Sequence, residues 1–207
     1  MAITRRSKTL LILAVLTVAL GAWWNGSRVE IVNAHPSGAN VIAFGDSLTK
    51  GVGAGPGEDY PAQLSQLIGI PVLNRGVSGE TTAQALKRLE RDVLSQNPRI
   101  VIVCLGGNDL LQHQPVSQTF ANLEEIVNQI QGKGALVVLV GIKGLMFADN
   151  HGPEYKKLAV RRGAVFVPDV LSGILSDPKL KFDQIHPNGQ GYKIVAQRIY
   201  EAIRPYL

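Results

Sequence analysis

Short apolar runs alternate with amphipathic stretches along residues 40–207. An uninterrupted apolar run is typical of a strand buried on both faces, whereas apolar residues three and four positions apart indicate a helix with one buried face. By these patterns we expect strands over 41–44, 71–74, 99–105, 135–140 and 164–167. We expect helices over 58–68, from Ser78 or Gly79 through Leu94, and over 118–130, 152–163 and 187–206.

This alternation of strands and helices predicts the fold class. Strands separated by helices pair in parallel through right-handed crossovers. We therefore expect a three-layer α/β/α domain with a five-stranded parallel sheet in the flavodoxin-like order 2-1-3-4-5. In such a sheet the carboxyl ends of all strands lie at one edge, so residues that follow different strands meet there.

The N-terminal segment does not fit the alternation. Arg5, Arg6 and Lys8 precede an uncharged stretch whose apolar centre is 10–22. A positive stub followed by a short apolar block is typical of an export signal. We therefore expect residues 1–24 to be either an export signal or a membrane anchor, rather than a helix of the domain.

Cleavage of this segment stays open at the level of sequence. Small residues in Ala19-Leu20-Gly21 have the spacing that a signal peptidase accepts, which favours a periplasmic or secreted protein. Trp23 and Trp24 suit a membrane interface, which favours a protein anchored in the membrane and facing outward. The polar residues 25–39 are expected to be a linker to a folded domain at 40–207.

Charge and cysteine content exclude several classes of function. Of the net charge of +5, three charges fall in residues 1–34, which leaves the domain nearly balanced. Because the domain has no dense run of Lys and Arg with interleaved aromatics, nucleic-acid binding is not expected. Cys104 is the only cysteine and is expected to be a buried small apolar residue. No zinc-type spacing of Cys and His occurs, so no metal is expected.

Candidate chemistry begins with Ser47, which follows the first strand in Gly45-Asp46-Ser47. The tripeptide alone favours an ordinary turn, since Gly, Asp and Ser are all typical turn residues. However, Gly79 follows the second strand and Asn108 the third, so a backbone N–H and a side-chain NH2 are expected at the same edge. Acyl transfer requires such donors, because negative charge builds up on the former carbonyl oxygen. We therefore interpret Ser47 as a nucleophile.

Asp183 and His186 supply the remaining parts of that chemistry. A serine hydroxyl is a weak nucleophile until a neutral imidazole takes its proton, and a third group must hold the imidazole in the correct tautomer. His186 precedes Pro187 at the start of the final helix, and Asp183 lies three residues earlier. One short loop is therefore predicted to supply both the base and the group that orients it.

Four blocks, in this order, together resemble the SGNH (GDSL) hydrolases: Gly45–Leu48, Val77–Thr81, Gly106–Asp109 and Asp183–Asn188. The resemblance spans about residues 40–205 and points to the bacterial arylesterase, lysophospholipase and thioesterase branch. It implies a serine esterase that cleaves small-molecule or lipid esters through an acyl-serine intermediate, without a metal or organic cofactor.

The resemblance also assigns roles to individual residues. It implies a catalytic triad of Ser47, Asp183 and His186, with an oxyanion hole formed by the Ser47 amide, the Gly79 amide and the Asn108 side chain. The chain departs from the family at Gln184, where Gly is common, and in the short helix expected over 152–163. The second departure leaves the shape of the acyl pocket open.

Several alternatives stay open. Within the hydrolases, the protein could instead remove acetyl groups from an envelope polysaccharide, and outside them it could be a catalytically silent binding module. Apolar residues after the third and fourth strands either line an acyl groove or cover the core: Leu110, Leu111, Leu145, Met146 and Phe147.

Other polar residues are interpreted as structural. Asp46 and Asp109 are expected to stabilise turns by hydrogen bonds rather than to act as a catalytic pair or as metal ligands. His35, His113 and His151 are expected at the surface.

Overall fold

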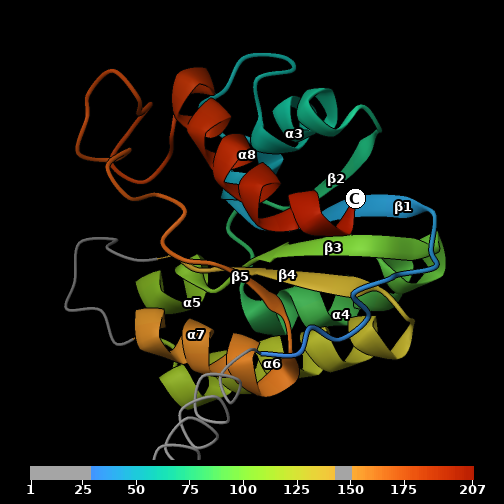
Figure 1. Cartoon of the computed structure of the whole chain (residues 1–207). Coiled ribbons are helices and arrows are strands. Elements are labelled where there is room, and N and C mark those ends of the chain that lie inside the picture. The colour runs from blue at the N-terminus through green and yellow to red at the C-terminus, as the bar shows by residue number, and fades with distance from the viewer. Residues whose placement is uncertain (1–28, 143–150) are drawn as a thin grey trace, which may run out of the picture. The chain divides into compact units, whose positions relative to one another are not determined.

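The computed structural model describes residues 29–142 and 151–207 (Figure 1). Its sheet has five strands in the order β2-β1-β3-β4-β5, and every neighbouring pair is parallel. The strands are β1 Asn40–Gly45, β2 Val72–Gly76, β3 Pro98–Cys104, β4 Leu136–Val140 and β5 Val165–Val167. The predicted fold class and strand order are therefore confirmed.

The described helices are α2 Ser47–Lys50, α3 Tyr60–Ile68, α4 Thr82–Asp92, α5 Gly107–Leu111, α6 Val116–Gly132, α7 His151–Arg162 and α8 Gly189–Ile203, with 3-10 turns η1 Leu94–Gln96 and η2 Arg204–Tyr206. The two shortest, α2 and α5, were not predicted. They directly follow β1 and β3, and four or five residues are too few for a helical period to show in the sequence.

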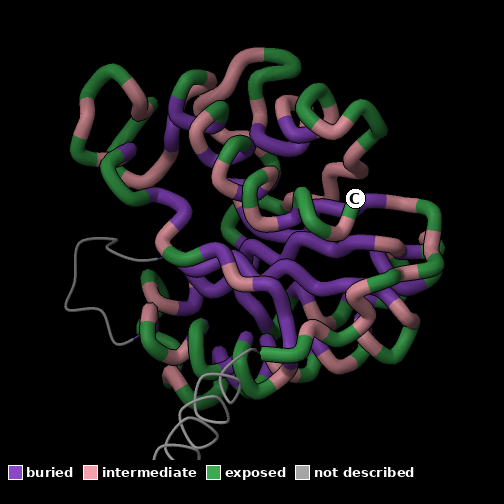
Figure 2. Tube along the Cα trace, in the orientation of Figure 1, coloured by how far each residue is buried: buried purple, intermediate pink, exposed green. Residues whose placement is uncertain are grey.

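Two apolar layers enclose the sheet, and β1 shows how the sequence builds them. Val41 and Ala43 pack on the side covered by α3 and α8. Ile42 and Phe44 pack on the other side, which α4, α6 and α7 cover. Figure 2 shows the central strands β1, β3 and β4 buried in the middle of the molecule, whereas β2 is only partly buried. Because both faces are covered, the ligand-accessible part of the sheet is its carboxyl edge.

Helix α4 begins later than the sequence pattern indicates. Its first turn is fixed by a capping box, in which the Thr81 side chain accepts from the Gln84 amide and Gln84 Oε1 accepts from the Thr81 amide at 2.9 Å. These reciprocal bonds satisfy the free amides of the first turn. The expected start near Ser78 or Gly79 is wrong, and both residues lie in the turn before the helix.

Helix α8 also begins later than position 187, at Gly189. The Asn188 side chain caps it by accepting from the amides of Gln190 and Gly191, each at 3.1 Å. His186 and Pro187 therefore belong to the loop between β5 and α8.

His151 corrects the expectation that it lies at the surface. It is 4% exposed, and its ring centroid lies 5.9 Å from that of Phe120. The physical reason is that α7 begins at His151, so its first turn packs against the buried side of α6 rather than facing solvent. His35 and His113 are exposed, as predicted.

Residues Ile31–Leu207 form one compact unit. Within it, part of the expected linker bonds to the rest of the fold: the Val32 amide donates to Gly163 O at 2.8 Å, and Asn33 Nδ2 donates to Gln131 O at 2.9 Å.

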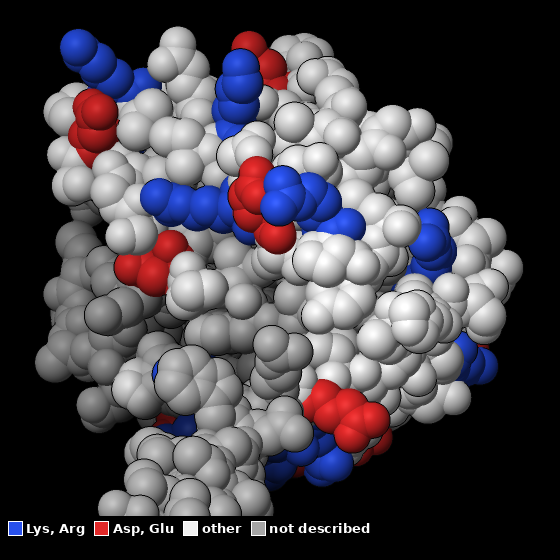
Figure 3. All heavy atoms as spheres, in the orientation of Figure 1, with Lys and Arg blue, Asp and Glu red and all other residues white. Residues whose placement is uncertain are grey.

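The expected signal or anchor, residues 1–24, lies outside the described residues. Over 29–142 and 151–207, none of the helices has the length and apolar character needed to span a membrane. Positive and negative side chains are scattered over the face shown in Figure 3.

Candidate active site

Ser47 stands where β1 turns into α2. Gly45 allows the strand to end in tight packing, because a Cβ there would lie 2.1 Å from Thr49 Oγ1 and 2.4 Å from Cys104 O. Asp46 then caps α2 by accepting from the Leu48 amide at 3.0 Å, as the turn interpretation predicted. Ser47 is half-buried and directly follows β1, at the carboxyl edge of the sheet.

The structure brings together the three residues of the predicted triad. Ser47 Oγ lies 2.9 Å from His186 Nε2, and His186 Nδ1 lies 2.8 Å from Asp183 Oδ2. Both distances are those of hydrogen bonds. Since the carboxylate accepts the Nδ1 proton, Nε2 is left free to accept the proton of the hydroxyl.

The loop that carries Asp183 and His186 is held by its own hydrogen bonds. Asp183 Oδ1 accepts from the amides of Ile185 and His186, each at 2.8 Å, and the Phe182 amide donates to His186 O at 2.9 Å. Partial burial alone would raise the pKa of Asp183, but the bonds from the imidazole and the two amides hold it below its usual value. The carboxylate therefore stays charged beside the imidazole.

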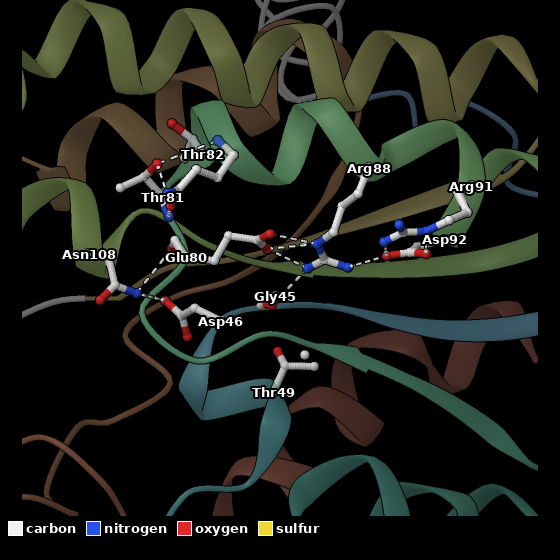
Figure 4. A network of polar contacts seen from close by, with 12 residues as sticks. Gly45, Asp46, Thr49, Glu80, Thr81, Thr82, Arg88, Arg91, Asp92 and Asn108 are labelled. Carbon is white, nitrogen blue, oxygen red and sulfur yellow. Dashed lines mark hydrogen bonds and ion pairs between the residues drawn. The ribbon is translucent and has the colours of Figure 1, made fainter.

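Gly79 and Asn108, predicted as oxyanion donors, are connected to the segment of Ser47 through their neighbours. Asn108 Nδ2 donates to Asp46 Oδ2 and to Glu80 O, each at 3.1 Å (Figure 4). Because both partners are acceptors, the NH2 end of the amide must face them. Gly79 has a φ of +78° and is exposed. Asn108 thus connects the residue before Ser47 to the residue after Gly79.

Two of the predicted apolar lining residues fall on α5. Leu110 is half-buried and Leu111 is 36% exposed. The other three, Leu145, Met146 and Phe147, lie outside the described residues. A further apolar side chain was not predicted: Phe182, the residue before Asp183, is 66% exposed. It carries no signal in the sequence beyond its place next to the Asp-x-x-His block.

Cys104 and Asp109 have structural environments. Cys104 is buried, as predicted, and burial raises the pKa of its thiol well above the usual range, so it is not poised as a nucleophile. Asp109 accepts from the Thr82 amide at 2.9 Å and from Thr82 Oγ1 at 2.6 Å. It therefore joins α5 to the start of α4 instead of stabilising only its own turn.

Sequence reasoning missed Glu80 and Arg88, which form a buried ion pair beside Asn108. The sequence contains a signal for this pair in the position of Arg88. Arg88 lies three residues after Ala85 and one before Leu89, on the apolar face of α4. An arginine on a face that is otherwise buried needs a partner there, because an unpaired buried charge is costly.

These features define a class of protein. A doubly wound α/β sheet that presents a serine, a histidine and an aspartate in one chain of hydrogen bonds at its carboxyl edge is the arrangement of a serine hydrolase. Over the described ranges, no group of three or more His, Cys, Asp or Glu side chains is placed to hold a metal ion.

Comparison with known proteins identifies the family. The GDSL-like Lipase/Acylhydrolase family matches residues 43–194. The chain is 25% identical to an arylesterase of Vibrio mimicus, over 84% of this chain and 92% of the relative. It is 28% identical to the thioesterase 1/protease 1/lysophospholipase L1 of Escherichia coli strain K12, over 80% of this chain and 83% of the relative.

A solved structure agrees with these relatives. The crystal structure of TesA superposes with a TM-score of 0.73 at 26% identity, over 82% of this chain and all of that one. The protein therefore belongs to the GDSL-like lipase/acylhydrolase family, and with it to the serine ester hydrolases.

Proposed function

We propose that Ser47 is the nucleophile of an acyl-ester hydrolase. His186 Nε2 takes the proton of the Ser47 hydroxyl as Oγ attacks the ester carbonyl carbon. When the tetrahedral intermediate collapses, the bond to the alcohol oxygen breaks and His186 returns the proton to that oxygen. A water molecule, deprotonated by His186, then releases the acid and restores Ser47. Asp183 holds the imidazole tautomer throughout.

The negative charge of the intermediate is assigned to three donors: the Ser47 amide, the Gly79 amide and Asn108 Nδ2. Their placement next to one another supports this, because Asn108 bonds to the neighbours of both other residues. In the described geometry both hydrogens of Nδ2 have acceptors. Asn108 Nδ2 therefore shares with the oxyanion the hydrogen that it donates to Glu80 O, as negative charge develops on the substrate oxygen.

The substrate class that we propose is an aryl, lysophospholipid or thioester type of acyl ester. The names of the two relatives support this class, and the apolar side chains of Leu110, Leu111 and Phe182 beside the site suit an acyl or aryl group. The positive stub and apolar block in residues 1–24 support an exported protein, either released or anchored in the membrane.

The observation that carries the proposal is the pair of contacts at 2.9 and 2.8 Å that joins Ser47, His186 and Asp183. The test compares wild type, Ser47→Ala and Ser176→Ala with a fluorophosphonate probe and with p-nitrophenyl esters of graded chain length. Ser176 is a matched control, since it is exposed and bonds to Gly173 O. Wild type and Ser176→Ala should be labelled and active, and Ser47→Ala should lose labelling and about 10⁴-fold or more of its turnover.

Other outcomes would redirect the assignment. Activity confined to acetyl esters, with polysaccharide acetate released, would indicate an envelope O-acetylesterase. A folded wild type that neither reacts with the probe nor hydrolyses any ester would contradict the catalytic proposal and favour a binding module.

A further inference from the structure

The buried side chain of Arg88 connects the two backbone segments that carry the proposed oxyanion amides. Its Nη2 donates to Gly45 O at 3.1 Å, two residues before Ser47. Its Nε donates to Glu80 Oε1 at 2.7 Å, and Nη2 also contacts Glu80 Oε2; Glu80 directly follows Gly79. One guanidinium therefore binds both the end of β1 and the turn before α4.

Asn108 bridges the same two segments from the other side. It bonds to Asp46, which follows Gly45, and to the backbone oxygen of Glu80. The contacts therefore close into a ring that runs from Gly45 through Asp46, Asn108, Glu80 and Arg88 back to Gly45 (Figure 4). Ser47 and Gly79 each lie one residue outside this ring. We refer to it as the anchoring ring.

The rest of the environment fixes the orientation of Arg88. Its Nη1 donates to Asp92 Oδ2 at 2.9 Å, one turn along α4, and its Cζ lies 4.3 Å from the centre of the Phe44 ring. Arg88 is 8% exposed and Glu80 is 7% exposed. Since the hydrogen bonds hold its nitrogens and Phe44 covers its face, the guanidinium has little freedom to rotate.

A role in stability alone does not account for this arrangement. A buried ion pair can often be replaced by well-packed apolar residues without loss of stability. An apolar pair, however, would leave the Gly45 carbonyl with only the bond from the Val77 amide at 3.0 Å, and would remove the side-chain bond at 3.1 Å that ties the end of β1 to Glu80. A lysine would keep the charge but could not bind Glu80, Gly45 and Asp92 together, because its ammonium lacks the planar fork of donors.

We propose that Arg88 is a positioning residue that sets the spacing of the Ser47 and Gly79 amides through the anchoring ring. This inference rests on the proposed function, in which those amides bind the oxyanion. Arg88 does not touch substrate: it acts on the transition state through Gly45 and Glu80. A loss of this kind should lower kcat more than it changes KM, because the negative charge on the oxygen is absent from the bound substrate and develops in the transition state.

The test uses the full-length protein with Arg88→Lys, Arg88→Met and the matched control Arg91→Met. Arg91 lies on the same helix and shares Asp92 as partner, but its side chain is 76% exposed and lies outside the ring. For Arg88→Lys we expect kcat to fall by roughly 10- to 100-fold with KM within about threefold, because a displaced donor costs less than a deleted one. Arg91→Met should keep wild-type kcat and KM.

Hydrogen exchange of the Asp46 and Val77 amides provides a readout that does not depend on turnover, since they lie in the two anchored segments and donate to Cys104 O at 3.3 Å and to Gly45 O at 3.0 Å. Both amides should exchange faster in Arg88→Lys than in wild type and Arg91→Met, under conditions in which all three are folded. If Arg88→Met does not fold, Arg88→Lys carries the comparison. A folded Arg88→Lys with wild-type kcat and wild-type exchange would overturn the proposal.

This design separates the two levels of the proposal. If wild type hydrolyses no ester and the fluorophosphonate does not react, the proposed function fails, yet exchange of the two amides still decides whether Arg88 anchors them. If wild type is active and Arg88→Lys changes neither kcat nor exchange, only the positioning role fails.

Discussion

The two oxygens of Asp183 have different partners, and this division explains how one carboxylate both shapes a loop and orients a base. Oδ1 accepts two backbone amides, whereas Oδ2 accepts the ring nitrogen of His186. The backbone amides of the loop bind only Oδ1. A substitution that changes Oδ2 should therefore affect the His186 ring and leave the backbone contacts of the loop in place.

Asp183→Asn should separate the two roles. Asparagine can keep an oxygen toward the amides of Ile185 and His186, but its NH2 then faces Nδ1 and favours the tautomer with a proton on Nε2. That imidazole cannot accept the Ser47 proton, so kcat should fall by roughly 10³- to 10⁴-fold at pH 7. Steady-state kinetics and a urea unfolding curve measure the two effects.

Asp177→Asn is the matched control for this prediction. Asp177 lies in the same inter-element loop and its Oδ1 accepts from the Lys179 amide at 2.9 Å, but it does not contact His186. Its kcat should stay at the wild-type value. Equal kcat in Asp183→Asn and Asp177→Asn would contradict the orienting role of Asp183.

Asp46 predicts a dependence of stability on pH. Burial raises its pKa from 3.8 to about 7; the Leu48 amide opposes the rise and the charge of Glu80 adds to it. The native state therefore holds this proton more tightly than the unfolded chain does. By linkage, the contribution of Asp46 to the free energy of unfolding is complete below pH 3.8 and is lost as the pH rises to about 7.

The measurement is urea unfolding of wild type and Asp46→Asn at intervals between pH 4.5 and 8. The wild-type free energy of unfolding should decline with pH relative to the variant, by roughly 4 kcal/mol over the full titration, of which about 3 kcal/mol falls between pH 4.5 and 8. Parallel pH profiles for the two proteins would show that Asp46 does not titrate in this interval.

At the scale of an element, the turn between β2 and α4 is set by Gly79. Its φ of +78° lies in the left-handed region, and a Cβ there would meet no atom within 4 Å. Gly69, which ends α3, has nearly the same φ of +72° and the same open surroundings. The two glycines therefore have the same backbone requirement but differ in their distance along the chain from the proposed site residues.

Gly79→Ala and Gly69→Ala should lose similar stability, about 1 kcal/mol each, because alanine is strained in this conformation. Only Gly79→Ala should lose activity, by more than tenfold in kcat, since relief of the strain turns the amide away from the oxyanion. Thermal unfolding and steady-state kinetics on both variants test this. Equal activity in the two would remove the Gly79 amide from the oxyanion hole.

The elements also show which parts of the structure could be predicted from sequence. Four of the five strands were predictable because each is largely an apolar run, and the long helices because their apolar residues recur at helical spacing. Strand β2 has only Val72 and Leu73 as apolar residues before Asn74 and Arg75, so its end extends beyond the expected 71–74. The start of α4 was not predictable, because the capping bonds between Thr81 and Gln84 outweighed the turn residues at Ser78 and Gly79.

The site residues could be proposed from sequence because Ser47, Gly79 and Asn108 each follow a strand, and Asp183 and His186 precede the last helix; their roles stay predictions. The role of Arg88 was missed because Glu80 and Gly45 lie 8 and 43 positions away in the chain, and only its third partner, Asp92, has the i,i+4 spacing that a sequence shows.

For the molecule as a whole, stability depends on two apolar layers that the sheet keeps apart. Ile199 of α8 is fully buried on one side, and Ile126 of α6 is fully buried on the other. Each truncation to alanine should lower the free energy of unfolding by about 2–5 kcal/mol. Because neither side chain belongs to the site, kcat per folded molecule should stay unchanged.

Urea unfolding gives the two losses, and titration with the fluorophosphonate gives the concentration of folded sites. A large loss for one isoleucine and none for the other would show that the molecule depends on a single layer. A fall in kcat per titrated site would show that packing of that layer reaches the catalytic edge.

The loop that carries Asp183 and His186 determines how the site could be redesigned, because its two ends are joined by the bond from the Asn188 amide to Leu180 O. Its acid–imidazole pair is assembled within four consecutive positions and braced by the loop's own backbone, so its internal geometry does not depend on which strand faces it. Asp183 and His186 can therefore be moved together as one segment, and the contact that then has to be restored is the one between His186 Nε2 and Ser47 Oγ. In redesign, walls that belong neither to the proposed oxyanion donors nor to the anchoring ring are the ones to exchange for new substrates. The segment from Leu180 to Asn188 has to stay intact, and so does Gly53, where a Cβ would lie 2.5 Å from Phe182 Cβ.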